Sequence, residues 1–118
     1  MKTFKVSLLF ILSIFAAKFS FAQDSLSKET IKVWGNCGTC KKHIEKAAKS
    51  AGAVTANWNQ DSKQLKVSFD PAKTSSITIQ QAIAKAGYDT QDFKGDDKAY
   101  GNLDGCCQYE RKATAKKE

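Results

Sequence analysis

Two pairs of cysteines carry most of the chemistry that this 118-residue chain offers. Cys37 and Cys40 form a C-x-x-C motif with Gly38 and Thr39 between them, and we expect this motif to lie where a strand passes into a helix. The amide groups and the partial positive charge of a helix N-terminus lower the pKa of a nearby thiol. Because soft metal ions bind thiolates, the motif favours metal capture at neutral pH.

The number of sulfur ligands indicates which ion would bind. Two thiolates are a poor site for zinc, which normally takes four tetrahedral ligands, but they suit Cu(I) or another soft ion that accepts near-linear coordination. Cu(I) is therefore the expected cargo and Hg(II) another candidate, whereas Zn(II) or Cd(II) would need further ligands. Gly38 lets the backbone bend tightly around an ion. A partner's thiol can add as a third ligand before it replaces the first two.

The same motif at the N-terminus of a helix is also used by thiol–disulfide oxidoreductases. An exported chain would meet an oxidising compartment, which keeps that interpretation open. The thioredoxin type, however, needs a longer chain with a βαβ unit before the hairpin, whereas here a single helix separates the first strand from the hairpin. A purely structural disulfide is a third interpretation. We favour a metal-binding protein that is not an enzyme and keep a periplasmic oxidoreductase as the alternative.

The second pair, Cys106 and Cys107, lies in the C-terminal part of the chain. These thiols can complete a three- or four-thiolate site with the first pair, form a separate soft-metal site, or oxidise to a disulfide. A vicinal disulfide is disfavoured because adjacent side chains diverge in regular structure. We expect both to be accessory metal ligands, and if all four thiolates gathered, Zn(II) or Cd(II) would suit the site as well as Cu(I). His43, three residues after Cys40, is another accessory candidate, although a solvent-facing position is the simpler interpretation.

Residues 1–22 are typical of a secretory signal peptide. Lys2 and Lys5 precede an apolar run over residues 6–17, and Ser20 and Ala22 place small residues at the two positions that a signal peptidase reads. The run is shorter than the ~20 residues that span a bilayer. We therefore expect cleavage before residue 23, no stable membrane insertion afterwards, and a secreted, periplasmic protein.

Hydrophobic periodicity predicts the elements that position the cysteines. Apolar and polar side chains alternate over residues 30–34, 54–58 and 65–69, as in half-buried strands, and the last two are close enough to form a hairpin. Helical spacing covers residues 40–51 and a second helix that begins after an expected cap at Ser76. Gly52 and Gly87 are expected to end these helices.

Residues 88–93 can add a short fourth strand. The predicted order is then βαββαβ, an α+β ferredoxin-like arrangement in which two helices pack on one face of a four-stranded antiparallel sheet. We assign residues 23–29 to an N-terminal lead-in, residues 30–93 to this domain, and residues 94–118 to a C-terminal extension with a charged tail.

The charge balance argues against nucleic acid as a partner. The chain has 19 basic and 12 acidic residues, a formal charge of +7. Three of the lysines (Lys2, Lys5 and Lys18) lie in the leader, so the mature protein would carry about +4. The lysines are not interleaved with aromatic residues that could stack on bases. Nucleic acid is therefore not among the expected partners.

Three segments occur together in one order: the strand followed by Cys-Gly-Thr-Cys, the run Phe69-Asp70-Pro71-Ala72-Lys73-Thr74, and the run Ala86-Gly87-Tyr88-Asp89. With them, residues 30–93 resemble a heavy-metal-associated domain. That family includes copper chaperones, periplasmic mercuric-ion binding proteins and the N-terminal modules of metal-transporting P-type ATPases. The resemblance implies the βαββαβ fold, metal binding by Cys37 and Cys40, and a metal transporter or other thiol-bearing acceptor as partner. It also implies that Tyr88 lies beside the metal loop.

The chain departs from the family at one place in this loop. Family members usually carry Met-Thr before the first cysteine, with the Met side chain anchored in the core, whereas this chain has Gly35-Asn36. Either the loop is more mobile than in the family or Trp34 holds it in place of the methionine.

Overall fold

The computed structural model describes residues 25–112. In chain order the elements are β1 (Ser27–Lys32), α2 (Gly38–Ser50), β2 (Ala53–Trp58), β3 (Gln64–Phe69), α3 (Ser76–Lys85), α4 (Asp97–Gly101) and the 3-10 turn η2 (Gly105–Cys107). The predicted signal peptide and the last six residues lie outside the described range. Within that range, every helix is too short or too polar to cross a membrane.

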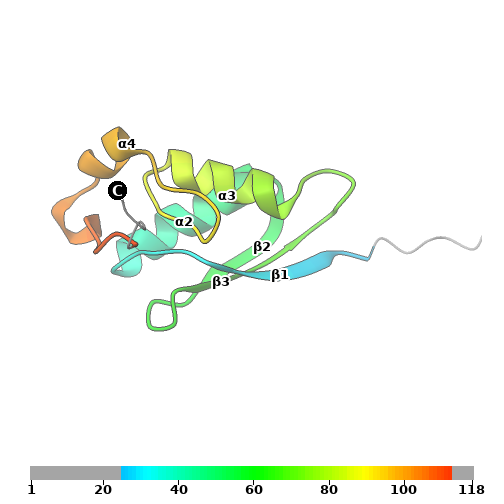
Figure 1. The fold of residues 1–118 in the computed structure, drawn as a ribbon. Coiled ribbons are helices and arrows are strands. Elements are labelled where there is room, and N and C mark those ends of the chain that lie inside the picture. Colours follow the sequence, from blue (N-terminus) through cyan, green and yellow to red (C-terminus); the bar gives the residue numbers. More distant parts are fainter. Residues whose placement is uncertain (1–24, 113–118) are drawn as a thin grey trace, which may run out of the picture.

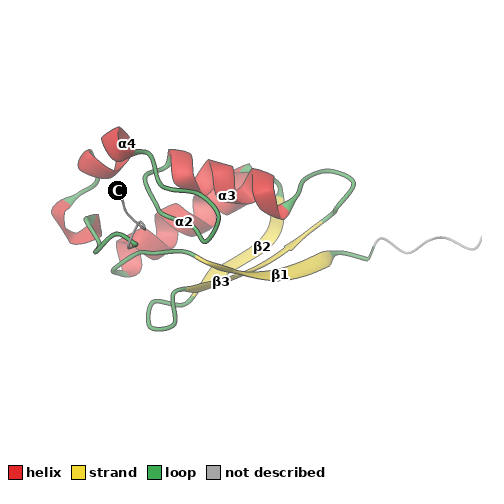
Figure 2. Ribbon diagram, in the orientation of Figure 1, coloured by secondary structure: helices red, strands yellow, loops and turns green. Residues whose placement is uncertain are grey.

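The strands form one antiparallel sheet in the order β1-β3-β2, and α2 and α3 cover one of its faces (Figure 1 and Figure 2). Side chains of a strand alternate between the two faces of its sheet. Leu65, Val67 and Phe69 of the central strand are buried in the core accordingly. The predicted hairpin is confirmed by the β2–β3 pairing, in which Trp58 lies opposite Leu65.

The two predicted helices are also confirmed. Their fully buried apolar residues lie at helical spacing and face the sheet: Ile44 and Ala48 in α2, and Ile79 and Ile83 in α3. Burying each isoleucine side chain contributes about 1.5–3 kcal/mol to the free energy of unfolding. This packing fixes α2, and with it the residues at its N-terminus, above the sheet.

Both helices end at the predicted glycines, but the N-cap of α3 is not the predicted residue. Gly52 and Gly87 adopt φ values of 109° and 102°, the left-handed region that glycine favours after a helix. The N-cap of α3 is Ser75, not Ser76. Ser75 has the extended backbone that an N-cap requires, and its side-chain oxygen accepts the Thr78 N–H. Ser76 already belongs to the helix.

The prediction of a fourth strand was wrong. Residues 88–93 reach the edge of the sheet beside β1, but within the described range they form only one isolated bridge, between Val33 and Thr90. The chain then turns, because the Thr90 N–H donates to the Phe93 carbonyl at 2.8 Å and the Phe93 N–H donates to Oγ1 of Thr90. These bonds use groups that a longer ladder would need, so the sheet has three strands.

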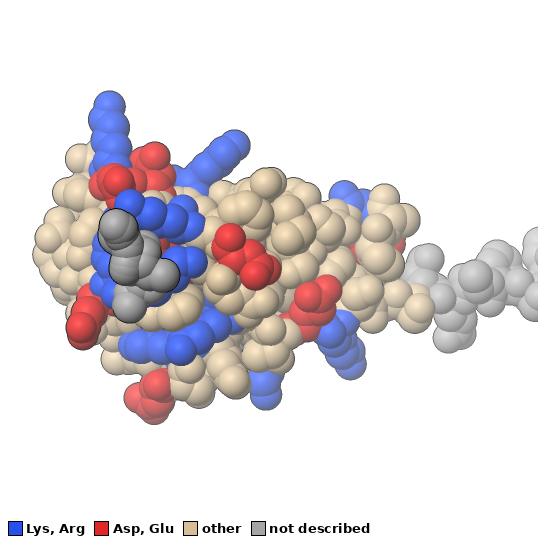
Figure 3. Space-filling model, in the orientation of Figure 1, with Lys and Arg blue, Asp and Glu red and all other residues tan. Residues whose placement is uncertain are grey.

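The C-terminal extension folds back over the end of the domain at which α2 begins (Figure 1), where η2 contacts α2. A Cβ atom at Gly87 would lie 2.8 Å from the backbone nitrogen of Tyr100, so α4 approaches the end of α3 very closely. Cys107 and Tyr109 are buried in the core. On the surface of the end at which α2 begins, basic and acidic side chains are interspersed (Figure 3). The extension includes the short helix α4, and it is part of the packed domain.

Candidate metal centre

The C-x-x-C motif lies at the N-terminus of α2, as predicted. Cys37 is the N-cap residue and its carbonyl accepts the first helical hydrogen bond, from the Lys41 N–H. Cys40 lies in the first helical turn and is fully buried. The helix geometry brings the Sγ atoms of Cys37 and Cys40 to 3.9 Å from each other. Both thiols are free.

The backbone at the helix N-terminus favours the ionised form of Cys37. The Cys40 N–H makes the largest contribution and lowers the pKa of Cys37 to about 7. The Thr39 N–H and the neighbouring Cys106 and Cys40 thiols act in the same direction, whereas partial burial opposes them. A substantial fraction of Cys37 is therefore thiolate at neutral pH, the form that binds soft metals and reacts as a nucleophile.

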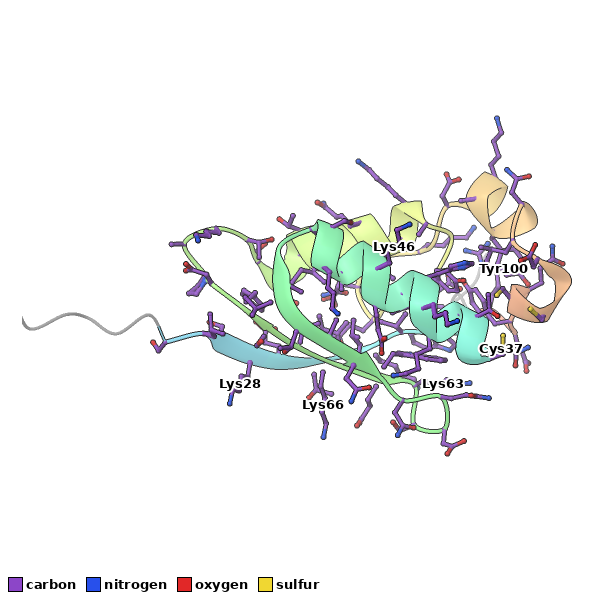
Figure 4. The ribbon with its side chains drawn as sticks, turned by 180° about the vertical axis from the view of Figure 1, so that it is seen from behind. Lys28, Cys37, Lys46, Lys63, Lys66 and Tyr100 are labelled. Carbon is purple, nitrogen blue, oxygen red and sulfur yellow. The ribbon has the colours of Figure 1, made fainter. Side chains whose placement is uncertain are left out.

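Cys107 joins the motif from the other end of the chain. Its Sγ atom lies 4.0 Å from that of Cys37, and the Sγ atoms of Cys37, Cys40 and Cys107 all lie within 4.8 Å of one another. Cys107 is as deeply buried as Cys40, whereas Cys37 is partly exposed. Burial raises the pKa of Cys107. The cluster thus has two sulfur atoms in the protein interior and one at its opening, beside the extension (Figure 4).

Cys106 and His43 do not join this cluster. The Cys106 thiol is exposed, with Sγ 3.9 Å from that of Cys107, and its carbonyl oxygen accepts hydrogen bonds of 3.3 Å from the Cys37 thiol and the Asn36 amide. The four cysteines all lie within the described residues, and none forms a disulfide. Of the four predicted thiols, three therefore converge, and the fourth lies beside them, where its thiol is near those of Cys37 and Cys107 and its carbonyl accepts from the Cys37 thiol.

His43 instead contacts the predicted near-site aromatic residue. Its Nδ1 atom lies 2.9 Å from the Tyr88 hydroxyl, and the Tyr88 ring is buried. Burial raises the pKa of Tyr88, and the adjacent Cys40 and Cys107 thiols raise it further. Tyr88 therefore separates His43 from the sulfur atoms and stays a neutral phenol beside them.

The loop before Cys37 packs directly on Trp58, a contact that was not predicted. Gly35 is buried, and a Cβ atom there would lie 2.9 Å from the Trp58 ring and 3.1 Å from Ile44. The Trp58 indole N–H donates to the Val33 carbonyl at 2.9 Å. The large indole thus takes up the space beneath the loop, and a glycine is needed above it. Sequence reasoning placed Trp58 on a strand but did not connect it with the glycine.

Tyr109 anchors the extension next to the cluster. Its hydroxyl donates to the Gly87 carbonyl at 2.7 Å and accepts the Asp89 N–H at 2.8 Å. Its ring stacks on Tyr88 with centroids 5.5 Å apart. The Tyr100 hydroxyl donates to the Tyr109 carbonyl at 2.7 Å. The segment that follows Cys107 is therefore fixed by hydrogen bonds and by aromatic packing.

An ion pair reinforces this anchor. The Arg111 guanidinium binds both carboxylate oxygens of the buried Asp89, at 2.6 and 3.1 Å, and also Asp97 at 2.6 Å. Burial of Asp89 alone would raise its pKa, but the Arg111 hydrogen bonds, helped by the Gly95 and Lys112 N–H groups, hold it below its ordinary value. Sequence reasoning missed this pair. The sequence did contain one signal of such a pair. Arg111 is the only arginine among 18 lysines, and arginine is the side chain that binds a carboxylate with two hydrogen bonds.

Comparison with known proteins gives consistent results. Residues 36–89 match the heavy-metal-associated domain. The copper chaperone CopZ of Staphylococcus aureus is 35% identical over 66 residues, which are 54% of this chain and 97% of that protein. Oxidized MerP of Ralstonia metallidurans CH34 is 30% identical with a TM-score of 0.53, over 57% of this chain and 96% of that one.

A third similar structure is the N-terminal domain of a potential copper-translocating P-type ATPase from Bacillus subtilis, solved in its Cu(I)-loaded state. It is 25% identical with a TM-score of 0.53, over 56% of this chain and 85% of that one. The segment with Cys106 and Cys107 lies beyond the matched residues 36–89. The matched residues cover nearly the whole length of the chaperone. The chain therefore belongs to the heavy-metal-associated domain family.

Proposed function

We propose that this protein is an exported carrier of a soft metal ion, with Cu(I) as its cargo and Cys37 and Cys40 as the primary ligands. The observation that carries the proposal is the convergence of these two sulfur atoms, 3.9 Å apart, at the N-terminus of α2. The lowered pKa of Cys37 supports it, because an ionised thiol binds the metal without first losing a proton. The similarity to a copper chaperone favours Cu(I), and the similarity to MerP makes Hg(II) the next candidate.

Transfer to a partner would proceed by exchange of sulfur ligands. Cys37 is partly exposed, so a thiolate of the partner can approach an ion bound there and add to it before Cys37 leaves. Copper stays Cu(I) throughout; an incoming group that is still a thiol releases its proton as it binds, and the cysteine that leaves the ion takes up a proton to the extent that its own pKa dictates. The similarity to a domain of a potential copper-translocating ATPase favours a metal transporter as the acceptor. Export rests on the signal-peptide pattern of residues 1–22.

The test is a Cu(I) titration of the reduced protein under anaerobic conditions, against a competing chelator. We expect about one ion per chain and a loss of affinity in Cys37→Ser and Cys40→Ser of more than about 100-fold, since even outer-shell partners cost 10–100-fold. Cys106→Ser is the matched control, because that thiol lies outside the cluster. Unchanged affinity in both Cys37→Ser and Cys40→Ser would refute the proposal.

The oxidoreductase alternative is separated by a second assay. The protein is incubated with insulin and a reductant, and precipitation of the released insulin chains is followed. We expect no turnover above that of the reductant alone, together with transfer of Cu(I) to a second thiol-bearing protein. Rapid insulin reduction that disappears in Cys37→Ser would favour the oxidoreductase.

A further inference from the structure

We infer that Cys107 is a third ligand of the cargo ion, so that the C-terminal extension completes a three-thiolate site. This inference rests on the proposed function, because it concerns the ion bound by Cys37 and Cys40. It goes beyond that function in assigning a metal-binding role to a segment outside the residues that match the family. All three coordination positions of the ion would then be filled by thiolates of this protein, without a thiol from a partner.

The spacing of the sulfur atoms supports three-fold coordination. With metal–sulfur bonds of about 2.3 Å, two sulfurs on opposite sides of a linear ion lie about 4.6 Å apart, whereas three sulfurs at the corners of a triangle lie about 4.0 Å apart. The Cys37–Cys40 and Cys37–Cys107 distances are 3.9 and 4.0 Å. Two of the three sulfur–sulfur distances therefore already match a trigonal site, and the third, between Cys40 and Cys107, is within 4.8 Å. The Cys37–Cys40 pair is closer than a linear site would require.

The third sulfur is held in place by its neighbours. The Cys107 N–H donates to the Asp104 carbonyl at 2.7 Å, and the Cys107 carbonyl accepts the Tyr109 N–H at 2.9 Å. Two and four residues further along the chain, Tyr109 and Arg111 fasten the extension to the domain. Ligands held in position before the ion arrives lose little conformational freedom when it binds.

A wholly internal third ligand has a consequence for transfer. In a two-cysteine site, the third coordination position is open to the partner's thiol. Here Cys107 would occupy it, so a partner must displace Cys107 or wait until it dissociates. The ion would be retained more tightly and released more slowly. When the reduced protein binds Cu(I), each ligand that is still a protonated thiol releases one proton, and copper keeps its oxidation state.

The experiment is X-ray absorption at the copper edge of the full-length protein loaded with one equivalent of Cu(I). We expect three sulfur ligands in the wild type and in Cys106→Ser. In Cys107→Ala and Cys107→Ser we expect two, with shorter copper–sulfur bonds. Competition titrations should show Cu(I) affinity weakened at least about tenfold in both Cys107 variants. Circular dichroism of each metal-free variant checks that it folds, and the serine variant keeps a side chain of similar shape if alanine leaves a cavity.

The outcomes separate this inference from the proposed function. Two sulfur ligands in the wild type, or three in both folded Cys107 variants, would overturn the role of Cys107 without affecting metal binding by Cys37 and Cys40. Unchanged binding in both Cys37→Ser and Cys40→Ser would overturn the proposed function itself. Equal losses of affinity in the Cys106 and Cys107 variants would also count against the inference, because the Cys106 sulfur lies outside the cluster.

Discussion

Cys37 combines two properties at the residue scale. It is the N-cap of α2, where backbone N–H groups favour its thiolate, and it is partly exposed, so that ions and reagents reach it. Cys40 and Cys107 are buried beside it. The sequence was sufficient to predict this low pKa, because a cysteine before a helical pattern lies among N–H groups that lack helical partners. The support that Trp58 gives the preceding loop was not predicted, because Trp58 lies 23 positions along the chain from Gly35, the residue that it contacts.

The first prediction concerns the reactivity of Cys37. In the reduced, metal-free protein, its rate of alkylation by iodoacetamide should rise with pH and reach half its maximum near the pKa of about 7. The thiolate is the reacting form, so lowering the pKa from the ordinary 9.0 moves the whole profile toward lower pH. Mass spectrometry of the labelled peptides measures the rate at each pH. A midpoint near 9 would contradict this assignment.

The second prediction concerns Gly35. In Gly35→Ala the new Cβ atom would lie 2.9 Å from the Trp58 ring, so the ring or the loop must move. We expect the free energy of unfolding to fall by about 1–3 kcal/mol, as for other overpacked cores. Gly38→Ala is the control, because a Cβ atom there meets nothing within 4 Å. Urea denaturation compares the two variants, and equal stability of both would show that the loop does not rest on Trp58.

At the scale of secondary-structure elements, hydrophobic periodicity predicted the elements whose formation depends on the local sequence. The two helices and the hairpin appear where the apolar spacing placed them, because each is stabilised by the face that it buries. The fourth strand and the anchored extension did not follow from periodicity. The turn between Thr90 and Phe93 ends the sheet ladder, and the extension depends on hydrogen bonds from Tyr109 and Arg111 to residues about twenty positions earlier. Such contacts leave no repeating pattern in the sequence.

The third prediction tests the anchor formed by Arg111. Arg111→Ala leaves the buried Asp89 carboxylate with only backbone N–H partners, and we expect a loss of about 3 kcal/mol, at the lower end for a broken buried ion pair. Thermal or urea unfolding measures it. Lys94→Ala removes only the exposed pair with Asp97 and should cost less than about 1 kcal/mol. Equal effects of the two substitutions would argue against an anchoring role.

The same pair predicts a pH dependence of stability. Asp89 has a pKa below its ordinary 3.8 in the folded protein. Its contribution is therefore fully present above that ordinary value, and it is lost as the pH falls through the lower folded value. Between about pH 5 and pH 2 the wild type should lose more stability than Arg111→Ala, in which this carboxylate lacks its main partner. Urea unfolding across this range measures the difference, and parallel losses would contradict the prediction.

At the scale of the whole molecule, the centre joins two distant segments. Cys37 and Cys107 are 70 positions apart in the chain, yet their sulfur atoms lie 4.0 Å from each other. The sequence predicted that the cysteine pairs belong to metal chemistry. It did not indicate which of Cys106 and Cys107 would face the site, because that depends on the direction of η2, which the buried Tyr109 sets.

The fifth prediction is that metal binding stabilises the whole fold. Because the unfolded chain does not hold these sulfur atoms together, free Cu(I) buffered at 100 times its dissociation constant should raise the free energy of unfolding by about 2.7 kcal/mol. The unfolding transition should therefore move to higher temperature in the wild type and in Cys106→Ser. Cys37→Ser should show no such shift at the same buffered copper level, and an equal shift there would place the ion elsewhere.

The central claim is that the sulfur atoms of Cys37 and Cys40 hold the ion. The most direct measurement is a count, by mass spectrometry, of the cysteines that one equivalent of Cu(I) protects from alkylation in the reduced protein. Cys37 should be labelled rapidly without metal and become protected with it, Cys40 and Cys107 should stay unlabelled in the loaded protein, and the exposed Cys106 should react in both states. Labelling of Cys37 at the same rate with and without Cu(I) would contradict the claim.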